Sequence, residues 1–288
     1  MKNYVIVTDS TADLPDNIIE EYNLTVIPLS YSFENEADNH ENKQLGIKEF
    51  YERLKNGERA TTTLINSKTF ENCFASLIEE GNDILYFGFS SALSGTYGSS
   101  QVAREEVLEK YKDARIECID TLAASLGEGL LVYYAAKMKQ EGKSLDEVIQ
   151  WVSDNKLHLC HWFTVDDLNH LKRGGRISAM TATIGTALGV KPILHVDNEG
   201  RLVPVTKARG RKKSIQALVE RMEATCTNPE GQSVFITHAD CLEDAEYLSN
   251  LIKEKFNIKE IVINYIGPVI GSHTGQGALA LFFLGTER

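Results

Sequence analysis

Short apolar runs alternate with helical segments through the first half of the chain, and this alternation limits the folds open to it. Runs typical of buried strands cover residues 4–7, 24–33, 84–87 and 115–119. Segments typical of helices lie between them, near residues 15–22, 46–54, 68–80 and 96–111, with a polar loop expected over 57–67. Strands that alternate with helices pair in parallel and are covered by helices on both faces. We therefore predict an α/β fold with a parallel sheet in this half.

The order of elements changes after a pair of helices expected over residues 123–141 and 144–156. A hairpin is predicted where the β-rich runs 192–196 and 202–206 flank four turn residues. The other elements expected here are a strand near 159–165, helices around 166–188, a helix over 212–225, a strand over 233–237, a helix over 242–256 and strands over 260–266 and 279–284. We predict two domains, 1–160 and 161–288, the second an α/β domain with a mixed sheet.

Charge and cysteine usage exclude several classes of protein. A formal net charge of −11 argues against a general nucleic-acid binder, which needs clustered positive charge. The uncharged stretch 261–286 is broken by Pro268 and His273, so we expect a buried strand, loop and strand and no membrane span. The five cysteines are scattered without a C-x-x-C pair, and the first strand leaves no room for a signal peptide. These features predict reduced thiols and a cytoplasmic protein.

Three loops rich in hydroxyl groups follow strands of the predicted parallel sheet, at 8–11, 90–96 and 120–121. Ligands of open parallel sheets bind at this edge. Loop 90–96 opens a helix at Gly95, where free N–H groups and the helix dipole favour an anion, although Ser94 could serve only as a helix cap. No G-x-G-x-x-G follows the first strand, and Lys137 stands where a P-loop ending at Ser144 needs glycine. We expect no ATP site.

Other chemistry remains open from the residues alone. Residues 88–92 approximate the G-x-S-x-G turn of a serine hydrolase, with Ser90 or Ser94 as nucleophile and His238 or His273 downstream. A sugar- or phosphate-sensing module at the same helix start is a further alternative. His158, Cys160 and His161 offer only two ligands on one strand face, so no metal site is expected.

Two basic clusters and one glycine-rich segment also stand out. The clusters, at residues 172–176 and 207–213, fit a solvated face, but arginine is also suited to capture carboxylate or phosphate. An acidic chain with such patches favours an acidic partner or ligand over duplex DNA. Residues 267–277 are interpreted as a polar site loop, in which glycines permit tight turns and His273 offers a hydrogen-bond donor.

Six segments in register resemble the DegV family of fatty-acid-binding proteins: 7–15, 90–97, 120–129, 171–178, 191–194 and 271–275. The resemblance runs from residue 5 to about 285. It implies a long-chain fatty acid of the palmitate, stearate or oleate class buried between layers, with no other cofactor. It also implies a partner, the ATP-binding subunit of a fatty acid kinase, which phosphorylates the carboxylate to an acyl phosphate for phospholipid synthesis. The chain itself would be a carrier subunit and not an enzyme.

The resemblance also assigns residues. It implies carboxylate contacts at Thr62, Thr63, Ser94 and Gly95, with His273 close by. It implies a kinase-facing surface at Arg173, Arg176, Arg209 and Arg211. The chain departs from the family pattern at Leu64-Ile65, where Gln-Pro is usual, and at Gln276, where Pro is typical. Apart from the resemblance, a helix rich in small residues is expected over 177–187; small residues there indicate either tight helix packing or room for an acyl tail.

Overall fold

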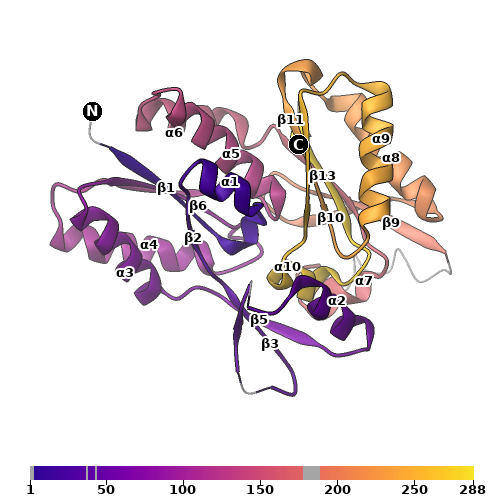
Figure 1. Ribbon diagram of the computed structural model, residues 1–288, viewed down its shortest axis with the longest axis horizontal. Coiled ribbons are helices and arrows are strands. Elements are labelled where there is room, and N and C mark those ends of the chain that lie inside the picture. The colour runs from indigo at the N-terminus through magenta and orange to yellow at the C-terminus, as the bar shows by residue number, and fades with distance from the viewer. Residues whose placement is uncertain (1–2, 37, 43, 178–188) are drawn as a thin grey trace.

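The structure is a computed structural model that describes residues 3–36, 38–42, 44–177 and 189–288. Its N-terminal half contains a four-stranded parallel sheet in the order β2-β1-β6-β7, as predicted (Figure 1). The strands are β1 (Tyr4–Asp9), β2 (Thr25–Ile27), β6 (Asp83–Gly88) and β7 (Ile116–Asp120). Their carboxyl ends meet at one edge, which brings the hydroxyl-rich loops together.

Helices cover both faces of this sheet because alternate strand residues are apolar on each side. One face packs on α3 (Ser67–Glu79) and α4 (Thr96–Lys110), with Tyr86 against Phe70 and Phe74. The other face packs on α5 (Leu126–Gln140) and α6 (Leu145–Asn155). The short elements η1 (Ser10–Ala12) and α1 (Asp16–Glu21) connect β1 to β2.

The C-terminal half contains a mixed six-stranded sheet in the order β10-β9-β8-β13-β11-β12. Its strands are β8 (Leu159–Thr164), β9 (Val190–Val196), β10 (Leu202–Arg209), β11 (Ser233–His238), β12 (Glu260–Tyr265) and β13 (Leu279–Leu284). The β9–β10 hairpin is confirmed, and only β11 and β12 pair in parallel. Helices α8 (Arg211–Thr225) and α9 (Leu242–Lys255) cover one face, and η3 (Pro229–Gly231) precedes β11.

Helix α5 lies between the two large sheets and packs against both (Figure 1). Its residues from Leu126 to Tyr133 are all buried, as expected for a helix enclosed on both sides. The six-stranded sheet begins at Leu159. The division into domains 1–160 and 161–288 stays a prediction, because α5 contacts both sheets.

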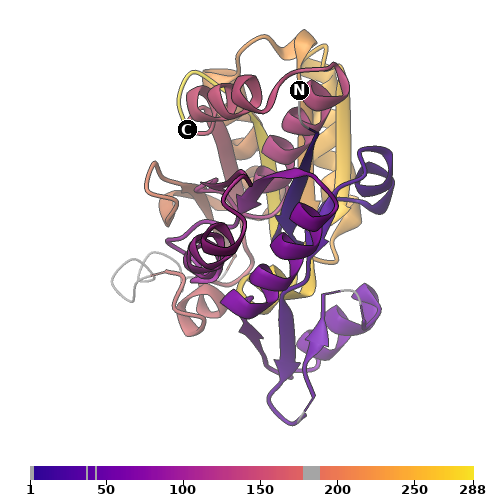
Figure 2. The same cartoon turned by 90° about the vertical axis from the view of Figure 1, so that its left-hand side faces the viewer.

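A third sheet was not predicted and protrudes with α2 from the rest of the molecule (Figure 2). It pairs β4 (His40–Glu41), β3 (Ser30–Phe33) and β5 (Ala60–Thr63) in antiparallel fashion beside α2 (Ile47–Lys55). The single strand predicted over 24–33 was wrong, because the chain leaves one sheet after Ile27 and joins another at Ser30, with Pro28 between them. Strand β5 lies inside the segment expected to be a polar loop.

The polar loop predicted over 267–277 was also wrong in part, because residues Pro268–Thr274 form helix α10. Pro268 occupies the first turn, where its missing N–H costs nothing, and Gly275 ends the helix with a φ of 72°. Helix α10 packs against α2, α7 (Leu168–Arg173), β3 and β5. The helix rich in small residues, expected over 177–187, falls almost wholly outside the described residues.

All five cysteines are free, as predicted. None of the helices in the described ranges has both the length and the apolar character needed to cross a membrane.

Candidate functional site

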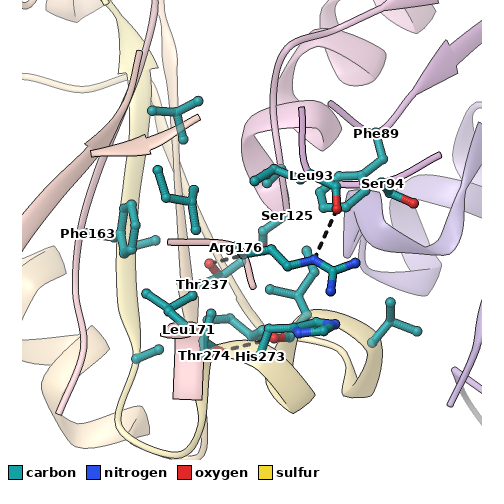
Figure 3. A pocket seen from close by; sticks show the side chains of 18 of the residues that line it. Phe89, Leu93, Ser94, Ser125, Phe163, Leu171, Arg176, Thr237, His273 and Thr274 are labelled. Carbon is teal, nitrogen blue, oxygen red and sulfur yellow. Dashed lines mark hydrogen bonds between the residues drawn. The ribbon is translucent and has the colours of Figure 1, made fainter. Parts of the chain in front are cut away.

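A cavity lies where the two large sheets and the third sheet meet (Figure 3). Phe89 and Leu93 line it from the N-terminal half, and Phe163 and Leu171 line it from the C-terminal half. The space between its walls, open mouth included, is about 1020 Å³. Most of its wall is apolar, so the cavity suits a ligand with a large hydrocarbon portion.

Polar residues gather at one end of the cavity. All five head-group residues implied by the sequence line it: Thr62, Thr63, Ser94, Gly95 and His273. Thr62 Oγ1 lies 2.8 Å from His273 Nε2, which joins β5 to α10. Ser94 precedes Gly95, the N-cap of α4, and its Oγ accepts a hydrogen bond from the Thr96 N–H at 3.2 Å. The structure brings these residues together; that they contact a ligand stays a prediction.

Arg176 also belongs to this polar end. Its side chain lines the cavity and lies between the Leu93–Ser94 turn and the ring of His273 (Figure 3). Its Nε donates to the Leu93 carbonyl at 3.1 Å, and Nη1 donates to the Gly174 carbonyl at 2.5 Å. Sequence analysis assigned Arg176 to a kinase-facing surface. The structure places its guanidinium on the wall of the cavity, and its role in facing a kinase stays a prediction.

The other three arginines of that predicted surface have different surroundings. Arg173 and Arg209 are exposed, and Nη2 of Arg173 contacts His170 Nδ1 at 3.0 Å. Arg211 is ion-paired with Asp244 at 2.8 Å, so its charge is already matched within the chain. Arg173 and Arg209 therefore offer the more available cations.

Burial controls the charge of His273. Together with the nearby Arg176 it lowers the pKa of the imidazole to about 4, burial being the larger cause. His273 is therefore neutral near pH 7. A Cβ on Gly174 would lie 2.2 Å from His273 Nδ1, so only glycine lets this turn approach the ring so closely.

Leu64 and Gln276, which depart from the family pattern, lie in different surroundings. Leu64 lines the cavity, is 45% exposed, and lies beside Gly95, where an added Cβ would be 3.2 Å from its Cδ2. It thus adds apolar surface at the mouth. Gln276 is not part of the lining and donates from Nε2 to Asp240 at 2.8 Å.

The serine-hydrolase alternative finds no support in the geometry. Ser90 is fully buried, and its hydroxyl donates to the Gly200 carbonyl at 2.9 Å. His238 accepts from the Cys241 N–H at 3.3 Å and packs on Tyr265. Within the described ranges neither Ser90 nor Ser94 is hydrogen-bonded to a histidine, and no cluster there is arranged to hold a metal ion.

Buried carboxyl groups behind the cavity were missed by sequence reasoning. Asp9 accepts hydrogen bonds from Tyr86 at 2.8 Å and from the Phe89 N–H at 3.2 Å, which fixes the start of the cavity loop. Asp13 accepts from Ser125, a cavity residue, at 2.6 Å and from the Gly267 N–H at 2.9 Å. Burial raises the pKa of Asp9 and raises that of Asp13 to about 7. The clue in the sequence was two aspartates directly after a buried strand.

Together, the fold and the cavity define an α/β protein in which the two large sheets and the third sheet line a mostly apolar cavity with a polar end. Residues 3–286 match a family model described as an uncharacterised protein of the DegV family. A DegV domain-containing protein of Clostridium perfringens is 52% identical over 289 residues, covering 100% of this chain and 99% of that protein. The chain belongs to the DegV family.

Solved structures share the whole fold. DegV of Bacillus subtilis, named a fatty acid binding protein, has a TM-score of 0.83 and is 31% identical, over 99% of this chain and 100% of that one. The fatty acid kinase B3 protein of Streptococcus pneumoniae, loaded with linoleic acid, has a TM-score of 0.85 over 98% of this chain and 99% of that one. At 23% identity, that second likeness shows the fold alone.

Proposed function

We propose that this protein binds a long-chain fatty acid in the cavity, with the carboxylate at the polar end. The observation that carries the proposal is the gathering of Thr62, Ser94, Arg176 and His273 at one end of a mostly apolar wall. About 15 methylenes at roughly 0.8 kcal/mol each contribute on the order of 12 kcal/mol before ordering costs. The family relatives named as fatty acid binders support the same ligand class.

The polar end suits a carboxylate because a buried charge needs hydrogen bonds and a nearby opposite charge. Thr62 and Ser94 supply hydroxyl groups, and the start of α4 supplies backbone N–H groups. Arg176 supplies the positive charge that the sequence reasoning had left out of the site. The neutral His273 adds a hydrogen-bonding group without a second charge.

Extraction of the purified protein tests this ligand class. Solvent extraction and mass spectrometry are expected to yield a long-chain fatty acid, and added palmitate or oleate is expected to bind in a direct titration. If no fatty acid is recovered and neither palmitate nor oleate binds, the proposal is wrong.

The finer part of the proposal is that the protein presents the carboxylate to a separate kinase subunit, which supplies ATP and forms the acyl phosphate. This role follows from the family resemblance, and exposed cations support it: Arg173 and Arg209 lie free of ion pairs in the part of the chain that the structure describes. On a chain of net charge −11, such cations suit an acidic partner surface.

A phosphorylation assay with a fatty acid kinase ATP-binding subunit tests the carrier role. Arg173→Ala and Arg209→Ala are expected to slow acyl phosphate formation while fatty acid affinity stays unchanged. Lys253→Ala, an exposed cation on α9, is the matched control and should leave both unchanged. If the kinase subunit does not phosphorylate the fatty acid bound to the wild-type protein, the carrier role is wrong.

A further inference from the structure

Helix α10 forms part of the cavity wall and carries one of the residues of its polar end. Four of its seven residues line the cavity: Val269, Ile270, His273 and Thr274. The ring of His273 extends from this helix toward Arg176 (Figure 3). A helix of this length is too short to be stable alone, so contacts with the rest of the chain must fix its place.

The start of α10 has no side-chain cap within its own sequence. Its N-cap is Gly267, and the next residue, Pro268, has no N–H. The first N–H groups of a helix have no partner inside it and need one elsewhere. Asp13 Oδ1 accepts from the Gly267 N–H at 2.9 Å. Asn42 Oδ1 accepts from the Val269 N–H at 3.0 Å. Two side chains from distant segments therefore hold the start of this helix.

Asp13 and Asn42 also enclose the backbone at this point. A Cβ on Gly267 would lie 2.5 Å from Asp13 Oδ1 and 2.6 Å from Asn42 Nδ2, so glycine is the residue that fits between them. Asn42 is fixed in turn, because its Nδ2 donates to the Ser10 carbonyl at 3.0 Å. The Asp13 carbonyl accepts from Asn264 Nδ2 at 2.7 Å. Both side chains are buried, which shields these hydrogen bonds from water.

We propose that Asp13 and Asn42 are positioning residues for the head group: they hold α10 so that His273 faces the ligand carboxylate. This inference rests on the proposed function. Neither side chain lines the cavity, so each acts through the helix. A binding group has to be held within about 0.5 Å of its productive position, and a helix released at its start does not hold His273 so closely.

A double-mutant cycle measured by titration with stearate tests the inference. Asn42→Ala is expected to weaken binding about tenfold, and His273→Ala by a similar factor, because in each case the carboxylate loses a well-placed partner. The protein with both substitutions is expected to bind little more weakly than His273→Ala alone, since no ring is left to misplace. If the two losses multiply instead, Asn42 does not act through His273 and the inference is wrong.

Asp13 supplies an independent pair of variants. Asp13→Ala is expected to weaken stearate binding about tenfold or more, because it releases the Gly267 N–H and also the Ser125 hydroxyl. Asp13→Asn keeps an oxygen that accepts from Gly267 and is expected to recover most of this loss. If Asp13→Asn binds as weakly as Asp13→Ala, the hydrogen bond to α10 is not what matters and the inference is wrong.

The control and the wild type separate the possible failures. Asn17→Ala, at an exposed position of α1, is the matched control for Asn42→Ala and should bind as the wild type does. If the wild type binds stearate and Asn42→Ala binds it equally well, the inference is wrong and the proposed function stands. If the wild type binds no stearate, both are wrong. Circular dichroism shows which variants fold, and if Asp13→Ala does not, the Asn42→Ala cycle decides.

Discussion

The Ser94 side chain both contacts the first turn of a helix and lines the cavity. Its oxygen accepts from the Thr96 N–H and contacts Thr96 Oγ1 at 2.9 Å. A hydroxyl has one hydrogen to donate and two lone pairs, so these contacts leave capacity for a ligand. The sequence alone presented helix capping and anion binding as alternatives for Ser94; in the structure Gly95 is the N-cap and no side chain caps the helix.

Substitution of Ser94 tests whether its side chain contributes to fatty acid affinity. Ser94→Ala is expected to weaken fatty acid binding by about 1–3 kcal/mol, through loss of a hydrogen bond to a buried carboxylate, and to leave the fold intact. Isothermal titration measures the affinity. Ser91→Ala, three residues earlier and exposed, is the control and should bind as the wild type does. Equal affinities of Ser94→Ala and wild type would show that the head group lies elsewhere.

Substitution of Arg176 distinguishes a role in binding the head group from a role in docking the kinase subunit. Because its guanidinium lines the cavity, Arg176→Gln is expected to lower fatty acid affinity by about 1.5–3 kcal/mol, the range for hydrogen bonds to a charged group. Arg173→Gln should leave affinity unchanged, since Arg173 is exposed. If Arg176→Gln keeps its affinity and loses only phosphorylation by the kinase subunit, the original sequence-based assignment is right.

At the scale of elements, two short segments carry side chains that form part of the polar end of the cavity. Strand β5 carries Thr62, and helix α10 carries His273. Helix α10 is held by close packing, because a Cβ on Gly271 would lie 2.6 Å from Tyr51 Oη and 2.9 Å from Phe50. The position of His273 thus depends on a glycine two residues earlier in the same helix.

Two glycines in helices give opposite expectations when replaced by alanine. Gly271→Ala is expected to destabilise the protein by about 1–3 kcal/mol through overpacking against α2. Gly98 lies at an exposed position of α4, with nothing within 4 Å of an added Cβ. Gly98→Ala is therefore expected to stabilise the protein by roughly 0.5–1 kcal/mol. Urea denaturation measures both. A stabilised Gly271→Ala would mean that α10 does not pack as described.

Elements could be predicted from the sequence where their signal is carried by neighbouring residues. The parallel strands and the β9–β10 hairpin were predicted because apolar runs and turn residues are local signals. Strand β5 was missed because Ala60–Thr63 has a polar composition and alternates only between half-buried and exposed positions. Helix α10 was missed because seven residues containing Pro268 and Gly271 are too short to show a helical period.

The site was predictable to a similar degree. Five residues were expected at the head group through family motifs, and they line one cavity, while their contact with a ligand stays a prediction. The place of Arg176 was not predictable, because it depends on how the turn after α7 folds back onto Leu93. Strand alternation placed His161 on the face opposite Cys160, but only the packing of the second sheet shows that this face lines the cavity.

At the scale of the whole molecule, buried polar contacts join the two halves around the cavity. Asp13, in the N-terminal half, accepts from the Gly267 N–H, and its own carbonyl accepts from Asn264 at 2.7 Å. Tyr51 donates to the Ile266 carbonyl at 2.7 Å. Arg288 donates to the carbonyls of Leu122 and Asp197, at 2.6 and 3.1 Å.

The Asp13 carboxyl makes stability depend on pH. Burial raises its folded-state pKa from 3.8 to about 7, so folding favours the protonated form. Its contribution to stability is therefore complete below about pH 4 and is lost as the pH rises toward 7. Asp13→Asn, which resembles the protonated carboxyl, is expected to reduce this decline in urea denaturation between pH 4.5 and 7.5, an interval chosen to span much of that range.

The other buried carboxyls, Asp9 and Glu128, keep their own contributions in the Asp13→Asn protein. Asp38→Asn, at an exposed position, is the control and should leave the pH profile unchanged. An unaltered profile in Asp13→Asn would show that this carboxyl is ionised in the folded protein.

Strand β13 runs through the middle of the six-stranded sheet, between β8 and β11, and is the last of the six to leave the ribosome. Its residues Ala280 and Phe282 form part of the cavity wall. A nascent chain therefore has neither a continuous sheet nor a closed cavity until β13 has emerged. On the proposed function, a fatty acid can therefore be enclosed only after β13 has formed. A chain that ended before Leu279 would leave the edges of β8 and β11 unpaired, which favours aggregation.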